Sequence, residues 1–461
     1  MTLTEAFLHL CGQGAAAFPQ ARTARRAKAL ALSAMLCAGR KWVTRMLCVK
    51  QAEFLDWSAD YKLFSRSPWN ARDLFGTPVT ESLRWFGEGP IRLGADETRT
   101  RRGGNKVKRS RWTRDPMSPP FHVNFMKGIR WVQFSALLPL HQRQDVGALG
   151  IPVAFEPVDL PAKPKRKASE EEWAAYRKAK EQNNLCLKTL EILRHLRRAY
   201  DQAGAASKRI LLALDGGFCN QVMFRAALDR ITLVARCRKD AKLCHRAKDP
   251  ANPRRVYGKR KFTPEDVRQD ERYGWKTAEV WFGGTRRKIR YKEVRKVLWQ
   301  GGARTRPLRL LVIAPTGYKP SPGAKTCYRE PAFLLCTDHE TETVELLQCY
   351  IDRWQIEVNH RDEKQHIGVA DAQVWNDESV DRLPAFLVCT YALLMLAALQ
   401  AYGPTRTTEY LTPPKWQNKH RQRPSCVDLI QKLREEAHQN PVVEQEVGFP
   451  VDLTHIILRA A

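Results

Sequence analysis

The spacing of apolar residues changes along the chain, and the two spacings predict an α/β fold. Short apolar runs bounded by turn residues predict strands, at 91–96, 128–140, 208–214, 231–236, 308–315 and 332–338. Apolar residues three and four positions apart predict helices, at 23–49, 169–203, 221–230 and 342–366. The order strand, turn, helix, strand between 208 and 236 indicates that the centre of the protein is an α/β core.

One long apolar segment fits either a membrane span or a buried helix. No charged residue lies between Arg382 and Arg406, and the segment contains PAFLVCTYALLMLAALQAY. About 18 apolar residues suffice to cross a bilayer. Pro384, Thr390 and Gln400 interrupt the segment. We therefore expect a core helix and no membrane association.

Length and charge indicate a multidomain protein with a polyanionic partner. The chain has 461 residues, enough for about three domains. It carries 78 basic and 49 acidic residues, a net charge of +29, which attracts nucleic acid and exceeds what solubility requires. The 12 scattered cysteines and the start MTLTEAFLHL, which lacks a signal-peptide pattern, indicate a cytoplasmic location.

The charge is concentrated in one segment. Residues 236–309 hold 24 basic and 8 acidic residues, more than half of the excess of the whole chain. Tyrosines and tryptophans lie between these charges, and alternating runs such as AEVWFGG and RKIRYKEV predict antiparallel strands. Basic grooves with aromatic side chains bind phosphates and stack on bases, although aromatic residues in strands more often belong to a core.

The helix at 342–366 carries a narrow polar stripe. Four of its residues, at offsets 0, 3, 7 and 14, point within about 60° of one another at about 100° per residue: Tyr350, Arg353, Glu357 and Lys364. Arg361 lies on the same face. A solvated face with charge pairs would explain these cations. An acid among phosphate-binding cations is explained better if it binds a divalent metal that the phosphate also contacts.

Metal-dependent phosphodiester chemistry needs further carboxylates, and strand ends supply candidates. Asp96 follows IRLGA and Asp215 follows ILLAL, while Asp338 follows AFLLCT and competes with them. Each alone could be a turn residue. Together with Glu357, Asp96 and Asp215 make a coherent set for two divalent ions. Because all the ligands are carboxylates, we expect Mg²⁺, with Mn²⁺ able to replace it.

These segments resemble a known family. YIDRWQIEVNHRDEK fits Y-x2-R-x3-E-x6-K, the signature of a large group of DDE transposases from bacterial insertion sequences. LGADETRTRRGG resembles the first-acid region of that group and LLALDGGF resembles the second, and the similarity covers about residues 88–400. The extreme N- and C-terminal regions carry no such resemblance.

The resemblance implies a fold and a set of site residues. It implies a ribonuclease H-like catalytic core interrupted by a β-rich insertion, with Asp96, Asp215 and Glu357 as catalytic metal ligands. The expected regions are a helical DNA-binding N-terminal region at 1–85, the core at 86–235 and 331–405, a basic insertion at 236–330 and a basic C-terminal region at 406–461. Residues expected to contact DNA are Tyr350, Arg353, Lys364, Arg361 and, stacking on a flipped base, Trp299.

The resemblance also implies an activity. We expect a transposase that binds the ends of its element, cuts them with two Mg²⁺ ions and joins them to double-stranded target DNA, as a homodimer associated with the bacterial nucleoid. Two alternatives stay open at this point. One is a transposase-derived DNA-binding protein without catalysis, and the other is a nuclease without strand transfer.

Overall fold

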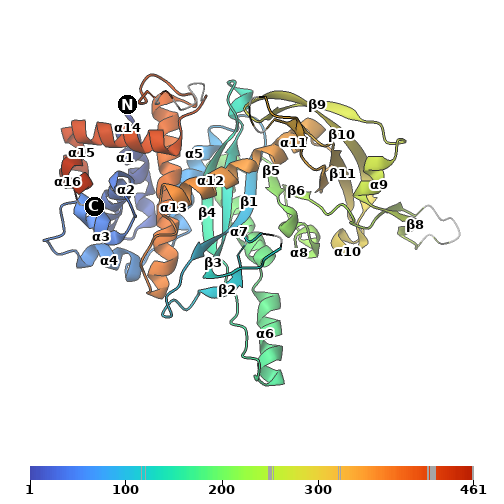
Figure 1. Ribbon diagram of the computed structural model, residues 1–461, viewed down its shortest axis with the longest axis horizontal. Helices are drawn as coiled ribbons and strands as arrows, with labels where there is room; N and C mark the ends of the chain where they lie inside the picture. The colour runs from blue at the N-terminus through green and yellow to red at the C-terminus, as the bar shows by residue number, and fades with distance from the viewer. Residues whose placement is uncertain are drawn as a thin grey trace.

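The computed structural model shows one large sheet beside a body of helices (Figure 1). It describes residues 1–458 apart from 116, 120, 248–251, 253, 320, 322, 413–414 and 416–421. The predicted α/β class is confirmed. Parts of the expected insertion and of the expected C-terminal region lie outside the described residues.

Helices from both ends of the chain pack together. The N-terminal part forms α1 (Leu3–Gln13), α2 (Ala21–Leu36), α3 (Val43–Val49), α4 (Ser58–Ser65) and α5 (Gly76–Leu83), and the C-terminal part forms α14 (Cys426–Gln439), α15 (Pro441–Val447) and α16 (Leu453–Leu458). A capping box between Thr2 and Glu5 begins α1. The Thr4 backbone N–H donates to the buried Glu436 of α14 at 2.9 Å, so the two ends of the chain form one body (Figure 1).

Helix α13 (Asp377–Tyr402) is the long apolar segment. Its 26 residues are long and apolar enough to cross a membrane, but 89% of its most apolar window is buried inside the protein. It packs against α1, α4, α5 and strand β4 (Leu149–Pro157). The expected core helix is therefore what the structure shows.

Five strands form the centre of the sheet, in the order β4, β3 (Phe125–Leu138), β1 (Ile91–Arg101), β5 (Ile210–Leu214) and β6 (Ile231–Arg236). β1, β5 and β6 are parallel, whereas β3 runs antiparallel to β1 and β4. Every residue of β5 is buried, which explains its continuous apolar sequence. The crossover from β4 to β5 contains α6 (Glu170–Gln182), which projects from the body, and α7 (Leu185–Tyr200) (Figure 1).

The basic segment after β6 is rich in strands, as its alternating pattern predicts, and these strands continue the same sheet. β14 (Ala332–Cys336) pairs with β6 and with β11 (Pro307–Ile313), and β10 (Thr285–Leu298), β7 (Leu243–Arg246) and β8 (Tyr257–Phe262) follow. β9 (Lys276–Phe282) pairs with β10, and β2 (Arg111–Arg114) pairs with β3. A separate small ribbon contains β12 (Gly317–Tyr318) and β13 (Cys327–Tyr328). The short helices are α8 (Gln221–Arg225), α9 (Pro264–Gln269) and α10 (Gln300–Ala303).

Two helices in near continuity, α11 (Thr343–Asp352) and α12 (Trp354–Gln365), cross the sheet centre (Figure 1). Strand glycines let α12 lie close to the backbone of the sheet. A Cβ at Gly94 of β1 would come within 2.5 Å of the Ile356 side chain, and a Cβ at Gly150 of β4 would collide with Asn359 Oδ1. Asn359 donates its amide to the Gly150 carbonyl at 2.9 Å, which fixes the helix on β4.

This close approach predicts that Gly150→Val destabilises the protein. The new side chain would meet Asn359 and lie 3.0 Å from Gln355 Cβ, so α12 must shift from the sheet. Overpacking of this kind costs about 1–3 kcal/mol. Thermal unfolding measures the loss, and Gly274→Val, at a glycine with no atom within 4 Å, is the control. Equal stability of the two variants would contradict the role of Gly150.

Candidate active site

Asp96 and Asp215 come from neighbouring strands. β1 and β5 run parallel, and Ala95 pairs with Leu214, so the acid that follows each of them stands at the same level of the sheet. Asp215 begins the turn after β5, whereas β1 continues past Asp96 to Arg101. The carboxyl ends of parallel strands are the usual place for ligand sites in open α/β sheets.

The helix expected over 342–366 is divided at Arg353, between α11 and α12. Arg353 keeps helical dihedral angles, but its N–H donates to Tyr350 O at 3.3 Å and its carbonyl accepts from Ile356 N at 2.9 Å. These bonds span three residues, as in a 3₁₀ turn, which tightens the helix at this position. The prediction of one uninterrupted helix is therefore wrong at Arg353, where the helix is interrupted for one residue.

Arg353 lies between two of the predicted acids. Its Nη1 donates to Asp96 Oδ2 at 2.8 Å, and its Nη2 donates to Glu357 Oε1 at 3.2 Å. Arg353 is 8% exposed, so its guanidinium is shielded from water in both ion pairs. The guanidinium joins β1 to the first turn of α12 and brings Asp96 and Glu357 to one point.

Asp215 belongs to the same electrostatic cluster. Burial raises the pKa of Asp96 to about 6, with Arg353 opposing the shift and the charges of Asp215 and Glu357 adding to it. The pKa of Arg353 is raised, with burial opposing the attraction of the three carboxylates and of Tyr350. Asp96 and Glu357 therefore pair with one guanidinium, and Asp215 lies near enough for its charge to act on both Asp96 and Arg353.

The sequence family described as DDE superfamily endonuclease matches residues 15–306, more than half of the chain. The chain belongs to the DDE superfamily endonucleases. A comparison with curated proteins gives no match. The family match contains Asp96 and Asp215 and ends before Glu357. Family membership supports a nuclease- or transposase-type function on DNA, and enzymes of this superfamily use divalent metals, generally Mg²⁺.

The carboxylates of this DDE endonuclease fit such a metal by their chemistry. Carboxylate oxygens are the donors that Mg²⁺ prefers, and the charges of Asp215 and Glu357 both act on Asp96. Within the part of the chain that the structure describes, no group of three His, Cys, Asp or Glu side chains is arranged to hold a metal ion. Arg353 occupies the space between Asp96 and Glu357 in this conformation.

The other predicted DNA contacts on these helices differ in their burial and in their partners. Tyr350 is half-buried, and its pKa is raised by burial, with Arg353 and Asp215 among the charges that act on it. Arg361 and Lys364 are exposed on α12, and Arg361 pairs with Asp362 at 2.9 Å. The predicted cationic stripe is thus divided: Arg353 neutralises acids, Lys364 is exposed, and Arg361 lines a cavity together with Gln355 and Asn359.

Trp299 and Asp338 lie in other surroundings. Trp299 is half-buried, packs edge-on against Phe224 with ring centroids 5.5 Å apart, and covers Gly302. Asp338 accepts from Arg209 at 2.8 Å and from Thr232 at 3.2 Å. The contacts of Asp338 are those of a buried structural acid at the end of β14.

Sequence reasoning missed a buried polar network on another face of α11. Gln348 accepts from Trp281 N at 2.7 Å and donates to Trp281 O at 3.1 Å, so one side chain binds the backbone of β9 twice. It also donates to Asp352 at 2.8 Å, and His141 contacts the other Asp352 oxygen at 3.1 Å. The only signal of this network in the sequence was the spacing of Gln348 and Asp352, two polar residues four positions apart in an otherwise largely apolar helix.

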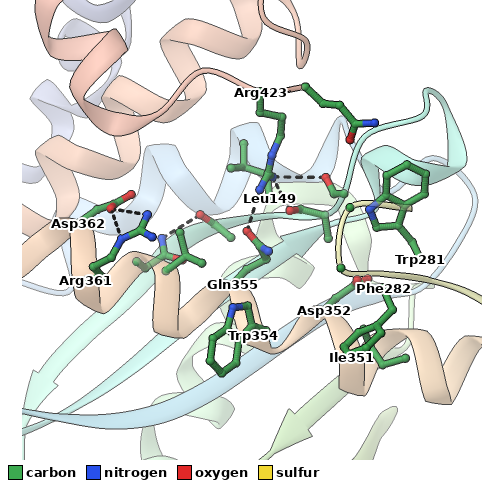
Figure 2. Close-up of a pocket in the computed structure, with 18 of the residues that line it drawn as sticks. Leu149, Trp281, Phe282, Ile351, Asp352, Trp354, Gln355, Arg361, Asp362 and Arg423 are labelled. Carbon is green, nitrogen blue, oxygen red and sulfur yellow. Dashed lines mark hydrogen bonds and ion pairs between the residues drawn. The ribbon is translucent and has the colours of Figure 1, made fainter. Parts of the chain in front are cut away.

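A cavity of about 530 Å³ lies against the opposite face of α12 (Figure 2). Gln355 and Asn359 line it, and each is two residues, or about 200°, from Glu357 around the helix. Trp281 and Phe282 of β9 form one wall. Arg423 donates to Gln355 Oε1 at 3.2 Å and to Gly147 O at 3.3 Å. The cavity and Glu357 therefore lie on opposite faces of α12.

A buried acid fixes the far half of α12. Gln133, which stands opposite Asp96 in the β1–β3 register, donates to Glu363 Oε1 at 2.7 Å. Glu363 is 2% exposed, and burial raises its pKa to about 8, against the opposing effect of this hydrogen bond. At neutral pH the native protein therefore keeps a proton on Glu363 that the unfolded chain releases.

This pKa shift predicts a stability that depends on pH. The carboxyl stabilises the fold most below its ordinary pKa, and the contribution is lost as pH rises from about 5 toward 8. The slope is about 1.4 kcal/mol per pH unit where only the native state is protonated. Glu363→Gln should remove this slope, so the difference in thermal unfolding midpoint between variant and parent grows from pH 5 to pH 8. A constant difference would contradict the buried protonated form.

Proposed function

We propose that this DDE endonuclease is a transposase that binds the ends of an insertion sequence, cuts them and joins them to target DNA. The observation that carries the proposal is the pairing of Arg353 with both Asp96 and Glu357, with the charge of Asp215 acting on the same guanidinium. Phosphodiester cleavage by two metals needs several carboxylates at one point. The family match supports the cleavage, and the Y-x2-R-x3-E-x6-K spacing supports the joining step.

Asp96, Asp215 and Glu357 would hold two Mg²⁺ ions, with Mn²⁺ able to replace them. When bound, the ions activate the attacking oxygen and stabilise the leaving oxygen of the phosphodiester. Asp96 is positioned by β1 and by its Oδ1, which accepts from the Glu97 N–H at 2.7 Å. Asp215 begins the turn that follows β5. Both backbones are therefore fixed before the ions arrive.

Arg353 would act as the resident cation until DNA binds. Three carboxylates in a partly buried site repel one another, and the guanidinium compensates them. A DNA phosphate offers Arg353 another anionic partner, so binding of DNA would draw the guanidinium from the acids and free their oxygens. Arg361 and Lys364, exposed on the same helix, would contact the backbone of the same DNA.

The sheet supports a ribonuclease H-like core. The order β4–β3–β1–β5–β6, with three parallel strands and antiparallel β3, places two acids on adjacent parallel strands. We assign 86–235 and 331–405 to this core, 236–330 to a basic insertion, and 1–85 and 406–461 to terminal regions that bind DNA or pack on the core. In this assignment β14 belongs to the core and pairs with β11 of the insertion, so the two regions would share one sheet.

Cutting both ends of an element requires two active sites, so we propose a homodimer in the DNA complex, located in the bacterial cytoplasm at the nucleoid. Tyr350 would contact DNA near the cleaved end, beside Asp215. Trp299 would reach a flipped base only if it leaves its packing against Phe224. The nuclease without strand transfer and the non-catalytic DNA-binding protein are the alternatives that the experiments below separate.

The role of Arg353 predicts competition between this side chain and metal. Arg353→Met removes a cation that lies 2.8 Å from Asp96, so Mn²⁺ should bind the DNA-free protein about tenfold more tightly. The same variant should unfold at a lower temperature in EDTA, because its acids lack a counter-ion. Calorimetric titration with Mn²⁺ measures the affinity. Weaker or unchanged Mn²⁺ binding would show that the guanidinium and the metal do not compete.

The assignment of Asp215 predicts a loss of cleavage without a loss of DNA binding. The substrate is a supercoiled plasmid that carries the DNA flanking the coding sequence, where the element ends would lie. Asp215→Asn should reduce Mg²⁺-dependent cutting at least about 1000-fold, because a metal ligand supplies several kcal/mol of transition-state stabilisation. Retention of the DNA in a gel-shift assay should change less than about twofold.

Glu340→Gln is the matched control, since Glu340 is an acid near the end of β14 whose side chain is 87% exposed. It should cut like the parent protein. Persistent cutting by Asp215→Asn would remove Asp215 from the site. Cutting by the parent without joined products would identify a nuclease, and binding without cutting would identify a non-catalytic protein.

A further inference from the structure

The β2–β3 hairpin exposes an unusual set of apolar side chains. Trp112, Met117, Phe121 and Phe125 are 70%, 88%, 91% and 66% exposed, and Val123 is also exposed. These residues lie within one hairpin, which continues β3 beyond the sheet centre. Exposed apolar groups gathered in one place mark a surface that binds a partner.

The charge around this hairpin identifies the chemistry of the partner. Residues 99–127 hold nine basic side chains and one acidic side chain, Asp115. The cross-strand pairs combine the two properties, since Trp112 stands opposite Lys127 and Arg114 stands opposite Phe125. Trp112 and Arg114 are both exposed, as expected for alternate residues of one strand face. Alternating cations and aromatic rings suit a partner with phosphates and stacked bases.

A second copy of this chain fits the surface poorly, because two hairpins with an excess of eight positive charges would repel each other. A two-stranded ribbon has the width of a DNA groove. Methionine, proline and phenylalanine are the residue types that DNA-bending proteins insert between base steps. The loop between the strands contains Met117, Pro119 and Phe121.

We propose that the β2–β3 hairpin binds in a groove of duplex DNA, with its cations on the phosphates and Met117 and Phe121 wedged against base pairs, so that the DNA bends. β3 connects this surface to the acids: from Gln133, opposite Asp96, to Phe125 is eight residues, or about 26 Å at about 3.3 Å per residue. With Asp96 at the cleaved phosphate, as in the proposed function, the hairpin contacts the DNA about eight base pairs from that phosphate. Only this spacing rests on the proposed function.

The test measures binding and bending in EDTA, where no cleavage takes place. The probe is a 50-base-pair duplex of mixed sequence with a donor and an acceptor dye at its ends. Met117→Ala with Phe121→Ala should weaken binding about tenfold and lower the energy transfer that reports bending. The dependence of affinity on salt should stay unchanged, because neither side chain neutralises a phosphate.

Two further variants make the result specific. Arg101→Ala with Arg114→Ala should reduce the slope of log affinity against log salt by about two. Leu187→Ala changes an apolar residue of α7 that is 38% exposed and lies outside the regions proposed to bind DNA, and it should bind and bend DNA like the parent. All the substituted side chains are exposed, so the thermal unfolding midpoints should be unchanged. A difference in DNA binding or bending is then not caused by misfolding of a variant.

Several outcomes would overturn the inference. Unaltered affinity and bending in the Met117/Phe121 variant would remove the wedge. A change in sedimentation of the DNA-free protein in that variant would assign the hairpin to a protein interface. Loss of binding to phosphatidylserine vesicles, with duplex binding retained, would assign it to a membrane surface. Because the assay contains no metal, failure of the transposase proposal in the cleavage assay would leave these results standing.

Discussion

The ion pairs of Arg353 with Asp96 and Glu357 are the interaction on which the arrangement of the site depends. Carboxylates that approach one another in a partly buried place repel: burial and the charges of Asp215 and Glu357 together raise the pKa of Asp96 to about 6, even with Arg353 opposing the shift. A cation between them offsets this repulsion. The guanidinium also connects positions 257 residues apart in the chain, so it fixes the first turn of α12 against β1. A site proposed to bind divalent cations thus contains a cation of its own.

The remaining contacts of α12 explain why this pairing is possible. Gly94 and Gly150 have no side chains to hold the helix away from the strands, and Asn359 and Glu363 attach it to β4 and β3 by hydrogen bonds. Through Arg353, the position of α12 against β1 determines where Glu357 lies relative to Asp96. The geometry of the acids therefore depends on packing that involves none of them.

The two faces of the α11–α12 pair contact different parts of the protein. One face meets the acids of the sheet centre, and the other binds the backbone of β9 through Gln348 and lines the cavity beside Arg423 (Figure 2). The basic strands β7 to β11 are joined to the centre through β14 as well. Positions of the acids and of the basic strands are therefore coupled by both helix packing and strand pairing.

Hydrophobic periodicity predicted the strands that lead to Asp96 and Asp215, the helical pattern around Glu357 and the buried helix α13. It could do so because the spacing of apolar residues follows directly from which side chains are buried. The family match supports the DDE resemblance that the acid regions and the helix spacing indicated. The sequence could not reveal that Arg353 turns toward the acids, since a helical wheel places it on the stripe without saying what lies opposite. Nor could it reveal that Gln348 binds β9 or that the ends of the chain pack together through Thr4 and Glu436. Those contacts join residues distant in sequence, and only the tertiary structure decides which faces meet, because each surface alone is compatible with many partners.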